Sequence, residues 1–77
     1  MHDPNLKTLG ERLRAARKAL GWTQEEFADA AGIDRSYAGG IERGERNITF
    51  SILCQLCRAL HCDVAQITKG IPREQRK

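Results

Sequence analysis

The sequence has few aromatic residues and no long apolar run. Its 77 residues contain one Trp, one Tyr and two Phe, so aromatics make up 5% of the chain, against 30% for charged residues. Because Leu, Ala and Ile supply most of the apolar side chains, the composition favours a small helical bundle over a β-sandwich. No run of eighteen apolar residues occurs, so we expect no transmembrane helix.

Cysteine is scarce as well, and its number is odd. Three cysteines cannot form a closed set of disulfides, and the polar start MHDPN lacks the apolar stretch of a secretory signal. We therefore expect reduced thiols and a cytoplasmic protein. The formal net charge of +3 is too small to separate a DNA-binding protein from other soluble proteins, so the positions of the charges carry more information than their sum.

The spacing of apolar residues predicts one all-α domain over residues 1–77. A chain of this length has no room for two hydrophobic cores. Apolar residues at intervals of three and four, bounded by capping residues and glycines, predict helices at 4–20, 24–31, 35–43, 50–60 and 64–69. The charged tail, 72–77, is expected to fray. The apolar stripe of the first helix consists of Leu6, Leu9, Leu13, Ala16 and Leu20.

The stretch from residue 24 to residue 43 organises the rest of the chain. Thr23 and Glu26 form a capping box before the second helix, Gly32 suits a turn, and Asp34 suits the cap of the third helix. Two short helices joined by such a turn predict a DNA-binding helix-turn-helix. The residues expected to face inward are Phe27, Ala28, Ala31, Ile33, Ala38 and Ile41.

The run QEEFADAAGIDRSYAGGIERGERN resembles the Cro and phage-repressor (XRE-like) family of helix-turn-helix regulators. Within it, DRSY followed by GIERGERN looks most like the controller proteins of restriction–modification systems. The resemblance covers residues 9–67 and implies a compact five-helix, lambda-repressor-like domain. It also implies a homodimer on a palindromic double-stranded operator, with the third helix in the major groove and its partner roughly 34 Å away.

The resemblance assigns roles to residues around the third helix. The implied DNA-binding residues are Gln24, Arg35, Ser36, Tyr37, Gly39, Arg43, Arg46 and Asn47. Among them, Arg35 is the best candidate to read a base, since a guanidinium can donate two hydrogen bonds to guanine. Gln24 falls at a phosphate-contacting position, and Arg43, Arg46 and Asn47 follow the DNA backbone. Arg17 and Glu42 occupy positions that pair as a salt bridge between the first and third helices.

Each of these residues has a plainer interpretation. Arg35 could only pair with a neighbouring carboxylate, Ser36 could only cap the helix, and Tyr37 could pack on the bundle. Gly39 and Gly40 stand where many relatives carry a side chain able to touch a base, and each costs roughly 1 kcal/mol in a helix interior. Such a cost indicates that something approaches their backbone closely. On the first helix we expect a solvated face at Arg12, Arg14 and Lys18.

A zinc site is the alternative suggested by Cys54, Cys57, His61 and Cys62. These residues share one helix and its end, which makes a poor tetrahedral cage, so we expect no metal and no cofactor. Buried free cysteine behaves as a small apolar residue. A redox role for Cys54 has no support in the sequence.

The sequence thus predicts a dimeric transcriptional regulator without enzymatic activity, membrane segment or small-molecule ligand. Its partners would be DNA, a second copy and RNA polymerase. The expected dimer interface uses exposed apolar residues of the last helix, namely Val64, Ile67 and Ile71. The alternative is an antitoxin-type or phage-type regulator whose main partner is another protein. A metal-dependent enzyme is a third hypothesis, which would require the cysteine cluster to hold the metal ion.

Overall fold

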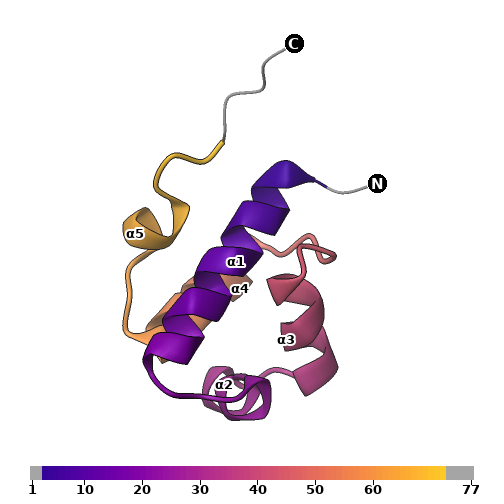
Figure 1. Ribbon diagram of the computed structural model, residues 1–77, viewed down its shortest axis with the longest axis vertical. Helices are drawn as coiled ribbons and strands as arrows, with labels where there is room; N and C mark the ends of the chain where they lie inside the picture. The colour runs from indigo at the N-terminus through magenta and orange to yellow at the C-terminus, as the bar shows by residue number, and fades with distance from the viewer. Residues whose placement is uncertain (1–2, 73–77) are drawn as a thin grey trace.

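The computed structural model describes residues 3–72, and this part of the chain is all-α (Figure 1). The expected charged tail therefore lies, from residue 73 onward, outside the described residues. The prediction of five helices is confirmed, although the first, third and fifth end one residue earlier than expected. The helices are α1 (Pro4–Ala19), α2 (Gln24–Ala31), α3 (Arg35–Glu42), α4 (Phe50–Leu60) and α5 (Val64–Thr68).

Side-chain caps fix where the helices begin. The Thr23 hydroxyl accepts from the Glu26 amide at 3.1 Å, and the Glu26 carboxylate accepts from the Thr23 amide at 2.8 Å. Asp34 caps α3, and Gly32 takes the left-handed conformation, at φ +72°, that ends α2. Each cap satisfies an amide that the first turn leaves unpaired, so local sequence alone sets these boundaries.

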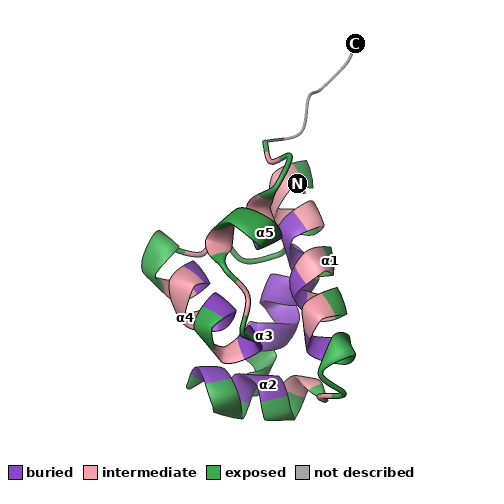
Figure 2. Cartoon of the chain, turned by 90° about the vertical axis from the view of Figure 1, so that its left-hand side faces the viewer, coloured by how far each residue is buried: buried purple, intermediate pink, exposed green. Residues whose placement is uncertain are grey.

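The core lies where the apolar faces of the helices meet (Figure 2). In this arrangement α1 packs on α3 and α5, while α2 packs on α3 and α4. Five of the six residues expected to face inward between α2 and α3 are buried, and Ile33 is half-buried. Leu20 is 40% exposed, because α1 ends before it, so its place in the apolar stripe was wrong.

A glycine that the sequence did not mark as important permits the close packing of α1 on α3. A Cβ atom built on Gly10 would lie 2.5 Å from the carbonyl oxygens of both Ile41 and Glu42. Gly44, just after α3, shows the same closeness, since its Cβ would lie 2.7 Å from the Cα of Lys7. The two backbones therefore meet with no room for a side chain between them.

The position of α5 corrects two expectations. Ile67 is only 5% exposed and belongs to the core, so the prediction that it is an exposed dimer residue was wrong. Val64 and Ile71 are half-buried and pack against the same core. Arg12 was expected to be solvated, but its guanidinium donates to the carbonyl oxygens of Ile67, at 3.1 Å, and of Lys69. Arg12 thereby ties α1 to the end of α5.

Two large apolar side chains of the described residues remain exposed: Phe50, at 69%, and Leu20. Over residues 3–72, none of the helices combines the length and the apolar character needed to cross a membrane.

Candidate nucleic-acid interface

The first turn of α3 presents Arg35 and Ser36 to solvent. Ser36 contacts the cap of the helix, Asp34: its amide donates to Asp34 Oδ2 at 2.9 Å and its hydroxyl donates to the same oxygen. These hydrogen bonds from Ser36 hold the pKa of Asp34 below its ordinary value. The cap remains ionised at neutral pH, and the Ser36 oxygen keeps lone pairs that can accept a further hydrogen bond.

Arg35 is exposed, and within residues 3–72 it forms no ion pair with Asp34 or Glu42. The Arg35 guanidinium therefore forms no close ion pair in the described part of the chain, although its charge contributes to the lowered pKa of the neighbouring Asp34. Its five N–H donors are available to a ligand at the start of the helix.

Glu42 lies at the buried end of α3 and connects three helices. Its carboxylate accepts from Arg17 Nε at 2.7 Å and Nη2 at 3.0 Å, which gives the expected ion pair between α1 and α3. It also accepts from Gln24 Nε2 at 3.1 Å and from Arg14 Nε at 3.3 Å. Arg14 was expected to be solvated; its position three residues before Arg17, on the same face of α1, was the signal that we missed.

Because Arg17, Gln24 and Arg14 all donate to it, the buried Glu42 carboxylate is held in its charged form. Burial alone would raise the pKa of Glu42, but the hydrogen bonds from Arg17 and Gln24, with the charge of Arg17, lower it below its ordinary value of 4.5. Gln24, the predicted phosphate contact at the start of α2, is thus oriented by Glu42.

We expect the Glu42 carboxylate to make the free energy of unfolding decrease at low pH. A carboxyl group whose pKa is lower in the folded state stabilises the fold fully above its unfolded pKa, near 4.5, and this stabilisation is lost as the pH falls through the folded pKa. The difference in unfolding free energy between wild type and Glu42→Gln should therefore shrink below about pH 4.5. Urea denaturation from pH 7 to pH 3 measures it; a difference that stays constant over this range would contradict the role of the charge.

The resemblance implied that Gly39 contacts DNA, which would require it to be exposed on α3, but it is not exposed. The residue is buried, because the side chains of Gln24 and Arg43 lie over it: a Cβ there would be 3.3 Å from Gln24 Oε1 and 3.1 Å from Arg43 Nη1. Gly39 can therefore act on DNA only through the side chains that cover it.

The remaining predicted contact residues lie at the end of α3 and in the loop that follows. Arg43 Nε pairs with Glu45 Oε1 at 3.1 Å, and both side chains are half-exposed. Tyr37 is half-buried against the core, and the Arg46 guanidinium lies over its ring at 5.6 Å from the centroid. Asn47 is exposed. Exposed cations thus stand at both ends of α3, with Tyr37 on the helix between them.

The cysteines do not join this surface. Cys57 is buried, and burial, with the neighbouring Cys62 and Cys54 thiols, raises its pKa to about 12, so it stays a neutral thiol. Cys54 and Cys62 are half-buried. Between residues 3 and 72, no three His, Cys, Asp or Glu side chains are grouped so that they could hold a metal ion.

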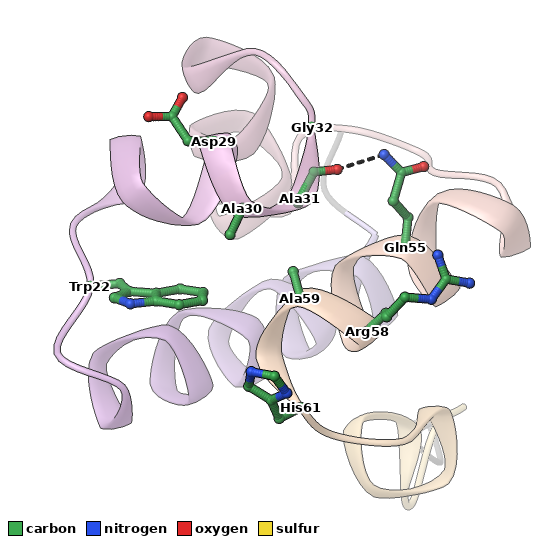
Figure 3. Close-up of a pocket in the computed structure, with 9 residues that line it drawn as sticks. All are labelled: Trp22, Asp29, Ala30, Ala31, Gly32, Gln55, Arg58, Ala59 and His61. Carbon is green, nitrogen blue, oxygen red and sulfur yellow. Dashed lines mark hydrogen bonds between the residues drawn. The ribbon is translucent and has the colours of Figure 1, made fainter.

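A hollow of about 570 Å³ lies between α2 and α4 (Figure 3). Trp22 closes one end, Ala30 and Ala59 face each other across it, and Gln55 Nε2 donates to the Ala31 carbonyl at 2.6 Å. None of the predicted DNA-contact residues lines it. The hollow is thus separate from the surface of α3.

Comparison with known proteins agrees with this geometry. Residues 13–67 match the helix-turn-helix family. The control protein C.SmaI of Serratia marcescens is 38% identical over 69 residues, which cover 87% of this chain and 82% of that protein. The competence pilus inhibition repressor of Acinetobacter baylyi is 36% identical over 59 residues, which cover 77% of this chain and 54% of that longer protein.

Solved structures of controller proteins have the same fold. The restriction–modification controller protein C.AhdI of Aeromonas hydrophila has a TM-score of 0.81 and 40% identity, covering 84% of this chain and 98% of its own. The controller protein C.Esp1396I, solved as a tetramer with its natural 35 base-pair operator, has a TM-score of 0.79 and 29% identity, covering 86% and 87%. The chain therefore belongs to the XRE-type helix-turn-helix family of transcriptional regulators, which includes restriction–modification controller proteins.

Proposed function

We propose that this protein is a sequence-specific regulator of transcription that binds a palindromic DNA operator as a homodimer, with α3 in the major groove. The observation that carries the proposal is the exposed start of α3. There Arg35 has no ion-pair partner within residues 3–72, while Glu42, at the other end of the helix, is fixed to α1 and α2. The complex of the controller protein C.Esp1396I with its natural operator supports the binding of a DNA operator.

In this mechanism the protein places side chains against the phosphates and bases of the operator, and no chemical reaction takes place. Gln24 stands at the N-terminus of α2, where the helix dipole favours a phosphate, and Glu42 holds its amide in place. Arg43 and Asn47 would contact the phosphates beyond α3, which sets register without reading sequence. Arg35 would donate to a base edge in the major groove. Binding in the cytoplasm would then block or recruit RNA polymerase according to the position of the operator.

Of the three residues that the sequence predicted for the dimer interface, Val64 and Ile71 remain candidates, because Ile67 is buried in the core. Both are half-buried in one copy, so a partner would cover what remains of their apolar surface. To read a palindromic operator, the two α3 helices of the dimer would have to lie roughly 34 Å apart, the separation of successive major grooves.

A binding titration tests the proposal. An operator is first selected from random DNA duplexes with the purified protein, and the titration is then repeated at two salt concentrations with the selected and a random duplex. We expect affinity to fall steeply with salt, while the ratio between the two duplexes stays on the order of a thousand or more. Equal affinity for both duplexes would overturn the proposal.

Arg35→Ala should separate base reading from phosphate binding. We expect operator affinity to fall by roughly 10- to 100-fold, equivalent to about 1–3 kcal/mol, with a loss of less than about threefold on random DNA. Lys18→Ala removes the same charge from an exposed position on α1 and should leave the specificity ratio unchanged. An equal loss on both duplexes would make Arg35 a phosphate contact only.

A further inference from the structure

Two consecutive glycines interrupt the middle of the short helix α3. Glycine is the poorest helix former after proline, and neither Gly39 nor Gly40 has the positive φ that would require it. Both residues are nevertheless buried. The reason for them must therefore be sought in what covers them.

The side chain of Arg46 covers Gly40. A Cβ atom at residue 40 would lie 3.0 Å from Arg46 Cγ, 3.2 Å from Nε and 3.6 Å from Cδ, so the whole stem of the arginine rests on the bare backbone. At Gly39 the corresponding contacts are made by atoms at or near the ends of Gln24 and Arg43, and not by the stem of either side chain. Gly40 is thus the glycine on which a neighbouring side chain depends.

The contact with Gly40 directs the Arg46 guanidinium along α3. From its loop the side chain reaches back to the Tyr37 ring, 5.6 Å from the centroid, and Tyr37 lies three residues before Gly40 on the same face of the helix. Arg46 has no ion pair among residues 3–72, so these two contacts define its position. The guanidinium thus lies over Tyr37, which is two residues after Arg35 in the sequence of α3.

We propose that Gly40 is a positioning residue that holds Arg46 on the DNA-facing surface of α3, where it recognises the operator together with Arg35. This inference rests on the proposed function. An arginine held before binding loses less side-chain freedom when DNA arrives, and its planar donors keep one orientation. Gly40 therefore lets the loop after α3 supply a side chain to the part of the helix where Gly39 and Gly40 have none.

Gly40→Ala tests the proposal without changing any charge. The added methyl group should displace the Arg46 stem, while the better helix former raises the melting temperature by up to about 4–8 °C. We expect operator affinity to fall about tenfold, the random-duplex affinity to change less than about twofold, and the salt dependence to stay the same. In DNA-free protein, the proton shifts of the Arg46 side chain should move toward those of an unstacked arginine.

The control is the same substitution in an Arg46→Ala background. If Gly40 acts through Arg46, Gly40→Ala causes no further loss of operator affinity there. An equal loss in both backgrounds, an unchanged operator affinity, or a lower melting temperature would each overturn the proposal. The proton shifts are measured without DNA, so they test the position of Arg46 independently of operator binding. If wild type showed no preference for its selected operator, the proposed function would fail, but this test of Gly40 would still stand.

Discussion

Glu42→Ala is expected to lower the free energy of unfolding by about 3–5 kcal/mol, because it leaves a buried arginine without its counter-charge. Glu42 is 2% exposed and Arg17 is 7% exposed. After the substitution the Arg17 guanidinium keeps one hydrogen bond, to the Trp22 carbonyl at 2.7 Å, while Arg14 and Gln24 lose their acceptor. Urea denaturation at pH 7 measures the loss, which is a large part of the 5–15 kcal/mol typical of a small domain.

A matched control is Glu11→Ala, which removes an exposed carboxylate 3.7 Å from Lys7 on α1. Exposed ion pairs contribute about 0–1 kcal/mol, so this variant should unfold close to wild type. If the two variants lost equal stability, the buried carboxylate would not be what holds α1, α2 and α3 together. A second test removes both charges: Arg17→Met with Glu42→Leu should recover much of the stability, because no charge then remains buried alone.

This double variant would also separate stability from function. Gln24 takes its orientation from Glu42, so DNA binding should remain weakened even where the fold is restored. The ion pair therefore joins α1 to the helix-turn-helix and, through Glu42, orients Gln24, which we propose contacts a phosphate.

The sequence predicted the elements that depend on neighbours within one turn. The Thr23 capping box, the Gly32 turn and the Asp34 cap are local, and the structure has all three. The position of Arg35 at the exposed start of α3 followed from those caps. Residues whose environment depends on other helices were misread, such as Ile67 and Arg12, because an apolar or charged pattern does not say which surface will cover it.

Glycines show this limit most clearly. The sequence marked Gly39 and Gly40 as costly, but it could not show that side chains from α2 and the following loop lie on them. Gly10 drew no attention, although a glycine between Leu9 and Leu13 in a helix interior is equally unfavourable. The structure shows the difference: Gly40 is covered by the Arg46 side chain, whereas Gly10 lies against the backbone of α3.

Gly10→Ala should lower the free energy of unfolding by about 3 kcal/mol, since the methyl group would have to displace α1 from the end of α3. Its Cβ would lie 2.5 Å from two carbonyl oxygens, and backbone in a packed helix cannot rotate away as a side chain can. Helix propensity alone would favour alanine by roughly 1 kcal/mol. The expected loss in the free energy of unfolding is a net value that already includes this gain. Chemical denaturation of the variant measures it directly.

Gly40→Ala is the matched control, because it makes the same substitution in another helix interior. There the nearest atoms belong to the Arg46 side chain, so stability should stay equal or rise. Opposite signs at the two positions would show that a glycine in this fold serves either close backbone packing or the seating of a side chain. A loss of stability at both would mean that Arg46 cannot move, whereas a gain at both would mean that α1 and α3 can separate without cost.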